Sequence, residues 1–307
     1  MRSKRAAPEP AHRDRFGDHV GSIGSKGDLQ LEHGQLRIRL LPWRIAVSAD
    51  GKLLYVACLN AFGVHVLNSS DGSYVRQFRD DNELIRHVGA ICVHGDLLVV
   101  AETGRKVFVF NTLDESLVRT IDRPDASDVN SVTTGVCMFD DQVYVCEDGA
   151  DSCVQVFSLS EGALLRTIGA RSSEPSVLGD FNGVCLSPDG SLIFVIDTAN
   201  YCVHVFRTLD GARVNSFGTK GPGVGQFNYP TEVRTSPSGE WLFVVESRNK
   251  RVQALRLRGS DVDGMHVHTI GGDVLHGMPL GCAVCPTSGL LYVTDTAGVD
   301  RVHAFAL

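Results

Sequence analysis

The stretch GTKGPGVGQFNYPTEVRTSPSGEWLFVVESRNKRVQAL, from Gly218 to Leu255, joins a glycine-rich linker to two apolar strand segments with a turn between them, and then to the start of a third strand. Degraded copies of this stretch recur along the whole length of the 307-residue chain. A strand-rich unit of this size cannot bury both of its apolar faces by itself, so successive copies must stack on one another. The sequence therefore predicts a single array of repeats.

The most apolar strand of each copy ends at a comparable position, and successive ends are 44, 45, 50, 49 and 49 residues apart. Another apolar segment precedes each of these strands, and turn residues such as Asp50-Gly51 close the hairpin between the two. The six segments are LLYVAC ending at Cys58, LLVVAE at Glu102, QVYVCE at Glu147, LIFVID at Asp197, WLFVVE at Glu246 and LLYVTD at Asp295. Because every unit consists of strands and turns, we expect an all-β fold, a six-bladed β-propeller, and not a helical solenoid.

The fourth strand of the unit is present in only five copies at the expected place: YVRQF, LVRTI, LLRTIG, RVNSFG and HVHTIG. The segment HVGSIG (His19 to Gly24) matches HVHTIG (His266 to Gly271), and the chain stops at Leu307 just after a third strand. We therefore expect the N-terminal strand, residues 19–24, to pair with the C-terminal blade and close the ring. Such pairing would remove an exposed strand edge.

Composition sets the class of protein. A hydrophobic content of 43% and 32 glycines fit one domain of many short strands, residues 16–307, after a basic, proline-containing tail, residues 1–15, that we expect to be disordered. No apolar run is long enough to span a membrane, and the N-terminus lacks the apolar core of a secretory signal.

Nine cysteines, an odd number, lie in or beside predicted strands, which fits a reducing compartment. We expect an intracellular, cytoplasmic protein, and the net charge of -7 gives no general attraction to DNA.

The repeat resembles that of the NHL family of β-propellers. The segments GVGQFNYP, SPSG, FVVES and NKRVQAL follow the order of the NHL unit, and FNGVCLSPDG, FVIDTAN and CVHVF repeat it in the fourth copy, while HGQL (His33 to Leu36) is a worn copy of the linker end. The resemblance covers residues 16–307, with strong copies in units four to six and weaker copies in units one to three. It implies the six-bladed fold, whereas propellers of this kind include scaffolds, RNA-binding domains and enzymes.

Carboxylates end five of the six strands, at Glu102, Glu147, Asp197, Glu246 and Asp295, and several of them could converge on a cation. An acid in nearly every unit is better explained by hydrogen bonds to local backbone. The stretch FNGVCLSPDGSLIFVID also resembles part of the calcium-dependent lactonase propellers, with Asn182 and Asp197 at ligand positions, but the other expected ligands are missing. A metal-dependent hydrolase is therefore the weakest alternative, and we expect no catalytic residue, metal or cofactor.

Histidine and cysteine patterns give no further site. His65, His204 and His303 occupy one position of the unit, where other copies carry Phe or Gln, so we expect them to pack in three different blades. Cys282 and Cys285 are three residues apart on a strand, which places their side chains on opposite faces and disfavours a zinc or redox pair.

An antiparallel four-stranded blade presents two kinds of loop. The interblade linkers and the loops between second and third strands, such as residues 218–229 and 247–250, form one face (the linker face), and the hairpin turns, such as residues 48–52, form the other (the turn face). The turn face is mostly acidic, whereas the linker face carries the most concentrated positive charge: Arg105, Lys106, Arg248, Lys250, Arg251 and Arg301. We predict a non-catalytic binding or scaffold protein that contacts protein partners through the linker face as a subunit of a larger assembly. RNA binding by the same loops is the alternative, although Phe62, Phe227 and Tyr229 are the only aromatic residues that we identify there for base stacking.

Overall fold

The computed structural model describes residues 16–23, 30–33, 36–39, 41–59, 61–78, 85, 87–123, 131–150, 152–170, 179–296 and 301–307. All regular secondary structure in these ranges is β-strand. No helix among the described residues has the length and hydrophobicity needed to cross a lipid bilayer. The N-terminal tail predicted for residues 1–15 lies outside the described residues.

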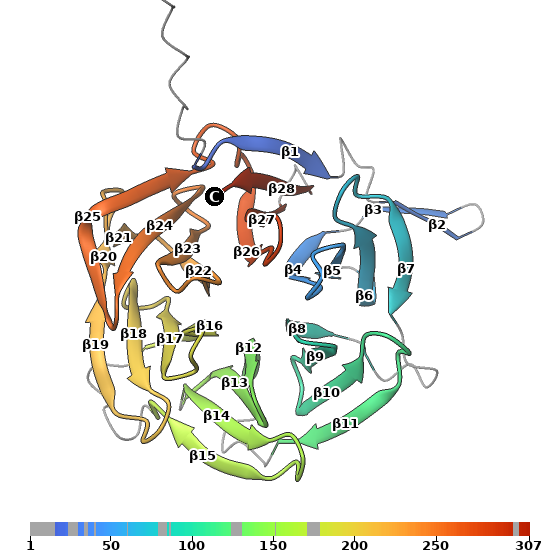
Figure 1. Ribbon diagram of the computed structural model, residues 1–307, viewed down its shortest axis with the longest axis horizontal. Coiled ribbons are helices and arrows are strands. Elements are labelled where there is room, and N and C mark those ends of the chain that lie inside the picture. The colour runs from blue at the N-terminus through green and yellow to red at the C-terminus, as the bar shows by residue number, and fades with distance from the viewer. Residues whose placement is uncertain are drawn as a thin grey trace, which may run out of the picture.

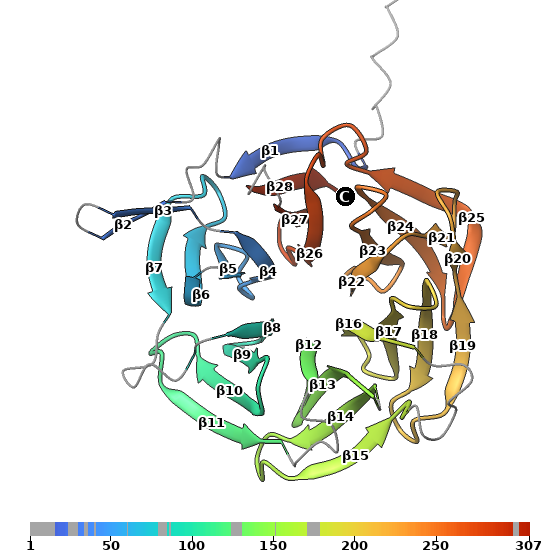
Figure 2. The ribbon, with the colours of Figure 1, turned by 180° about the vertical axis from the view of Figure 1, so that it is seen from behind.

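Six four-stranded antiparallel sheets stand around a common axis, as predicted (Figure 1; Figure 2 shows the reverse side). Five of them are consecutive in the chain: β4 (Pro42–Val47), β5 (Leu53–Cys58), β6 (Ala61–Asn68) and β7 (Tyr74–Phe78) in blade 1; β8 (Val88–His94), β9 (Leu97–Glu102), β10 (Lys106–Asn111) and β11 (Leu117–Asp122) in blade 2; β12 (Val132–Phe139), β13 (Gln142–Asp148), β14 (Cys153–Ser158) and β15 (Leu164–Ile168) in blade 3; β16 (Phe181–Leu186), β17 (Leu192–Asp197), β18 (Cys202–Arg207) and β19 (Arg213–Phe217) in blade 4; and β22 (Pro230–Thr235), β23 (Trp241–Glu246), β24 (Arg251–Arg258) and β25 (Asp261–Ile270) in blade 5.

Blade 6 combines the two ends of the chain. Its sheet has the order β1 (His19–Ile23), β28 (Arg301–Ala306), β27 (Leu290–Thr296) and β26 (Met278–Val284). β1 runs antiparallel to β28, with His19 opposite Phe305 and Ile23 opposite Val302. The neighbouring backbone adds a hydrogen bond from Gly17 N to Ala306 O, 2.7 Å long.

The core lies between the blades. The first three strands of each blade are nearly continuous runs of buried Val, Ile, Leu, Phe and Cys, which pack on both sides against the adjacent blades. Six buried clusters result, each shared by two neighbouring blades; Phe181, for example, packs between blades 3 and 4, and Phe227 between blades 4 and 5. The fourth strands are mostly exposed or half-buried, because they lie at the outer edge of each blade, and β7, β11 and β15 each have one buried residue near the end of the strand.

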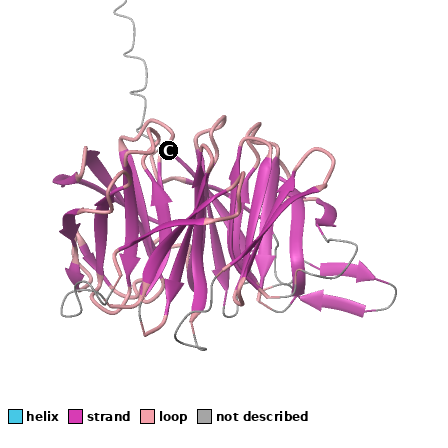
Figure 3. Cartoon of the chain, turned by 90° about the horizontal axis from the view of Figure 1, so that it is seen from below, coloured by secondary structure: helices cyan, strands magenta, loops and turns pink. Residues whose placement is uncertain are grey.

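Two further strand pairs lie in the linkers. β20 (Thr219–Lys220) and β21 (Gln226–Phe227) form a parallel pair in the glycine-rich linker, residues 218–229, that leads into blade 5. β2 (Gln30–His33) and β3 (Leu36–Arg39) form a hairpin that projects from the ring between β1 and β4 (Figures 1 and 3). His33 and Leu36, the ends of the HGQL segment that the sequence suggested to be a worn linker end, are paired with each other in this hairpin; Gly34 and Gln35 lie outside the described residues.

Candidate binding surfaces along the propeller axis

The first strand of each blade lines the central axis. Matching positions follow from the strand pairing, and one of them is occupied by Arg44, Ala90, Gly135, Gly183, Glu232 and Gly281. Four of these six residues are glycine or alanine, and the space that they leave at the axis accommodates the two long charged side chains. A Cβ atom added at Gly183, for instance, would lie 2.6 Å from Glu232 Oε1. Gly183 therefore leaves the space that the Glu232 side chain occupies.

Arg44 fills the middle of the ring. Its side chain is only 2% exposed, and its guanidinium donates hydrogen bonds to all five other blades. The acceptors are Gly89 O (3.3 Å), Thr134 O (2.6 Å), Asn182 Oδ1 (2.9 Å), Thr231 O (3.2 Å), Glu232 Oε2 (3.2 Å) and Leu280 O (3.2 Å). One arginine therefore connects the whole ring.

Glu232 is shared between two arginines. Its Oε2 lies 3.2 Å from Arg44 Nη1, and its Oε1 lies 2.8 Å from Nη1 of Arg234, which follows it by two residues on the same strand. Burial lowers the pKa of Arg44, and Glu232 opposes this effect. For Arg234 burial also lowers the pKa, but Glu232 and the neighbouring cysteines together outweigh it and raise the pKa. Glu232 is the only carboxylate among the described residues that forms an ion pair with either guanidinium, so the axial group carries one excess positive charge.

A cavity of about 330 Å³ opens on the linker face, and three of its lining residues, Asn182, Thr231 and Leu280, also accept hydrogen bonds from Arg44. Its wall is mainly apolar and consists of Leu41, Trp43, Leu59, Tyr229, Met278 and Leu280, with Asn182, Thr231 and Thr296 as polar members. Three of these side chains are substantially exposed: Leu59 (54%), Met278 (43%) and Tyr229 (39%). We call this site the linker-face cavity.

Basic residues of blade 5 stand beside this cavity. The Arg248 guanidinium lies 5.1 Å from the centre of the Tyr229 ring, and exposed Lys250 donates from Nζ to His276 O at 2.7 Å. Arg251 is turned inward instead. Its nitrogens bind Glu246 Oε1 (2.7 Å) and the linker carbonyls of Pro222, Gly223 and Gln226. The linker-face basic group predicted in blade 5 thus divides into two exposed cations and one that holds the linker.

The other predicted basic residues lie elsewhere on the ring. Arg105 and Lys106 are exposed in blade 2, where Lys106 Nζ is 3.9 Å from Asp122 Oδ1. Arg301 is half-buried in blade 6 and lies opposite Asp295 in the β27–β28 pairing. The structure therefore groups Arg248 and Lys250 in the β23–β24 loop with Arg251 at the start of β24, and it places the remaining three in other blades.

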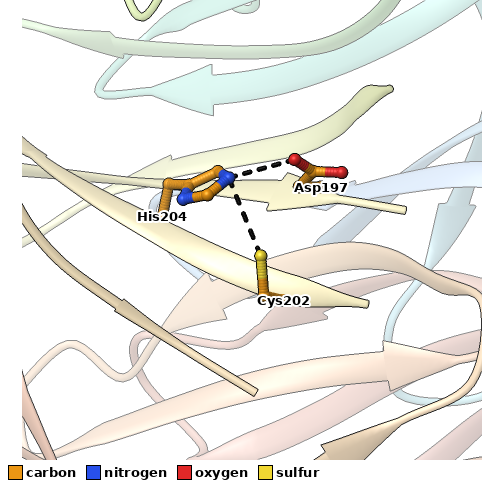
Figure 4. Close-up of side chains that lie close together, drawn as sticks. All are labelled: Asp197, Cys202 and His204. Atoms are coloured by element: carbon orange, nitrogen blue, oxygen red, sulfur yellow. Dashed lines mark hydrogen bonds and ion pairs between the residues drawn. The ribbon is translucent and has the colours of Figure 1, made fainter. Parts of the chain in front are cut away.

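Asp197, Cys202 and His204 form a buried group of potential metal ligands in blade 4 (Figure 4). The Asp197 carboxylate is already filled: Oδ2 accepts from Gly179 N (2.7 Å), Asn200 Nδ2 (2.9 Å) and His204 Nε2 (3.0 Å), and Oδ1 accepts from Asn200 N (2.9 Å). Burial raises the pKa of the Cys202 thiol to about 12. A cation would have to displace these donors. We therefore interpret the group as a hydrogen-bonded contact that fixes the linker at Gly179 to the end of β17 in blade 4.

The matching acids support this interpretation. Glu246 accepts from Asn228 N (3.0 Å) and Gln253 Nε2 (2.8 Å), and Asp295 accepts from Gly277 N (3.1 Å). The local backbone hydrogen bonds expected at the acidic strand ends are therefore confirmed at Asp197, Glu246 and Asp295.

The remaining histidine and cysteine predictions can be placed as well. His65, His204 and His303 lie in β6, β18 and β28, three strands of different blades. Cys282 packs between blades 5 and 6 and Cys285 between blades 6 and 1, so the pair is divided between two clusters as expected. All nine cysteines are described residues, and none of them forms a disulfide bond.

The sequence reasoning missed the axial residues Arg44, Glu232 and Arg234. A signal was available, because each is a charged residue in a first strand at a position where most other copies carry Gly, Ala or Cys.

No protein-family model and no curated protein sequence matches the chain. Among solved structures, it is similar to the β-propeller domain of Myceliophteria thermophila Cps50 (Swd1), with a TM-score of 0.61 and 12% sequence identity over 94% of this chain and 99% of that chain. The chain is a six-bladed β-propeller. At such low identity the similarity concerns the fold of the propeller alone.

Proposed function

We propose that this chain is a non-catalytic propeller of the NHL type, closed by its N-terminal strand β1, that acts as a binding or scaffold subunit of a larger assembly. The observation that carries the proposal is the linker-face cavity, whose mouth exposes Leu59, Tyr229 and Met278 around an apolar interior of about 330 Å³. Apolar side chains that converge on a cavity gain free energy when a partner covers them, whereas isolated exposed residues do not mark a site.

The backbone at the mouth supports this role. Tyr229 has a φ of 56°, a left-handed conformation that an aromatic residue rarely adopts, and Lys250 has a φ of 52°. Strained residues of this kind persist where the surrounding structure holds them, and they concentrate at binding sites. The strain at Tyr229 places its ring at the cavity, where it meets the Arg248 guanidinium. Tyrosine and arginine are also the residue types that contribute most to protein interfaces.

The partner that fits this surface is a protein segment with an apolar side chain flanked by carboxylates. The apolar side chain enters between Leu59, Tyr229 and Met278, and the carboxylates meet Arg248 and Lys250, which are both exposed beside Tyr229. We place this partnership in a reducing compartment, since nine cysteines without a disulfide bond are compatible with it.

RNA is the second candidate, and the Arg248–Tyr229 pair is the observation that favours it, because an aromatic ring beside a guanidinium can stack on a base. The two functions differ in their salt dependence. Contacts with phosphates weaken steeply as salt rises, whereas insertion of an apolar side chain does not.

The test is affinity capture of the tagged protein from its native cells, with mass spectrometry of proteins and sequencing of RNA, for wild type, Met278→Asp and Leu209→Asp. Leu209 is the matched control because it is 84% exposed in the turn between β18 and β19, on the turn face. We expect a protein that wild type and Leu209→Asp retain at 0.5 M salt and that Met278→Asp loses by at least tenfold, since burial of a Met side chain is worth about 1.5–3 kcal/mol. Equal recovery with all three variants, or RNA that is released by salt and lost in Arg248→Ala, would overturn the proposal.

A further inference from the structure

A second cavity, of about 350 Å³, lies at the opposite end of the axis, on the turn face. Its wall combines apolar and polar residues in similar shares: Ile45, Val47, Val93, Val284 and two prolines on the apolar side, and Arg234, Thr235, Ser236, Cys92 and His94 on the polar side. A cavity with apolar walls and a charged residue that can fix a ligand's orientation is typical of small-molecule sites. We call it the turn-face cavity; Arg44 and Glu232 are not part of its wall.

Arg234 lines this cavity and has unused hydrogen-bond donors. All three of its hydrogen bonds with described residues are made by Nη1, to Val184 O (2.9 Å), Val233 O (3.0 Å) and Glu232 Oε1 (2.8 Å). Nε and Nη2, which form the opposite edge of the guanidinium, have no acceptor among the described residues. This edge presents two parallel N–H groups, the geometry that binds both oxygens of one carboxylate.

The excess positive charge of Arg44, Arg234 and Glu232 also favours a bound anion. Arg44 and Arg234 share the single carboxylate of Glu232, and a buried charge without a counterion is costly. The neighbouring thiols do not supply the missing negative charge. Cys92 and Cys185 occupy the position of Arg234 in blades 2 and 4, and burial raises the pKa of both thiols to about 12, so both are neutral at physiological pH.

We propose that the turn-face cavity binds a small monocarboxylic acid with an apolar chain. Its carboxylate binds Nε and Nη2 of Arg234, and its chain lies against Ile45, Val93 and Val284. The exposed Asp50 and Asp96 lie on the turns that follow the lining strands β4 and β8, and the exposed Asp189 adjoins the lining residue Pro188. They repel phosphates and other polyanions more strongly than a single carboxylate, which favours a singly charged ligand.

Calorimetry with defined probes tests this site: acetate, butyrate and hexanoate, with hexanol and inorganic sulfate as comparison ligands. We expect affinity for the purified protein to rise about fourfold for each added methylene, because each buried methylene contributes a roughly constant transfer free energy. Hexanol, which lacks the carboxylate, and sulfate, which lacks the chain, should both bind at least tenfold more weakly than hexanoate. Equal affinity of hexanoate and either comparison ligand would overturn the proposal, as would the absence of any hexanoate binding.

Variants identify the location. Arg234→Ala introduces the residue that Ala46 and Ala283 supply at the same position of blades 1 and 6, and it should weaken hexanoate binding at least thirtyfold. Arg256→Ala, at a partly exposed arginine of the same blade, is the matched control and should bind like wild type. Ala283→Leu fills the cavity without changing any charge and should also abolish binding. Retained binding in both Arg234→Ala and Ala283→Leu would refute the site.

The proposed protein-binding site on the linker face can be tested independently of the carboxylate site on the turn face. Met278→Asp changes the other end of the axis and should leave hexanoate binding unchanged, whereas Arg234→Ala should leave capture of the protein partner unchanged. Loss of hexanoate binding in Met278→Asp would contradict the assignment to the turn face.

Discussion

Replacement of Arg44 by alanine should destabilise the propeller by about 3–5 kcal/mol, because it removes six hydrogen bonds of a buried guanidinium. Hydrogen bonds to charged groups contribute about 1.5–3 kcal/mol each, and the desolvation of the arginine offsets much of their sum. The substitution is sterically mild, since Ala90 occupies the same position in blade 2 and glycines occupy it in blades 3, 4 and 6. The loss therefore reports the guanidinium and not a backbone clash.

The magnitude follows from the contacts. Arg44→Ala removes six hydrogen bonds that reach five blades, and it leaves Glu232 with Arg234 as its remaining ionic partner. Water from the two axial cavities can hydrate the released carbonyl groups, so we add no further penalty for them. A loss of 3 kcal/mol would raise the unfolding equilibrium constant more than 100-fold.

Urea unfolding, followed by circular dichroism and by the fluorescence of the two tryptophans, measures this effect. Arg256→Ala is the control, because its ion pair with Glu240 is partly exposed and should contribute below about 1 kcal/mol. The double variant Arg44→Ala/Glu232→Gln should lose less than the sum of the single variants, since the two side chains are coupled. An Arg44→Ala loss no larger than that of Arg256→Ala would refute the reasoning.

Two further predictions concern the pairing of β1 with β28 and the hydrogen bonds of Asp197. Deletion of residues 1–24 removes β1 and leaves β28 as an open edge, so we expect a lower Tm and concentration-dependent aggregation in light scattering; an unchanged Tm would contradict this. Burial would raise the pKa of Asp197, but hydrogen bonds from His204, Asn200 and Gly179 N outweigh it and hold the pKa below the ordinary value of 3.8. The carboxylate therefore stabilises the fold at neutral pH, and this contribution is lost as the pH falls below 3.8. Asp197→Asn should be less stable than wild type at pH 7 and should converge with it at low pH in urea titrations, whereas a pH-independent difference would exclude this cause.

The strands could be predicted because local patterns specify them. Apolar runs such as LIFVID are buried against both neighbouring blades, and the repeat of these runs sets the number of blades. The linker assignment of Phe227 followed from the same repeat, and the structure buries this ring completely between blades 4 and 5.

The axis could not be predicted in the same way. What Arg44 contacts depends on how far apart the first strands of opposite blades stand, and no local pattern encodes that distance. Gly183 and Gly281 looked like ordinary residues at strand starts, although a Cβ atom at Gly183 would collide with Glu232 and one at Gly281 would crowd the backbone of Trp43 and Arg44. Likewise, the charges of the linker face could be assigned to loops, but whether a cation points outward, as Arg248 does, or into the linker, as Arg251 does, depends on tertiary contacts.

The buried Arg44–Glu232 ion pair on the axis also limits how symmetric this propeller can become. A ring built from six identical copies of any one repeat would place six arginines, six glutamates or six small residues at the position of Arg44. The first two rings would concentrate like charges at a point without solvent, and the third would leave an open pore. Divergence between the duplicated units is therefore a structural requirement at this position, and a designed consensus version would need at least two different repeat types to restore the arginine and its carboxylate partner.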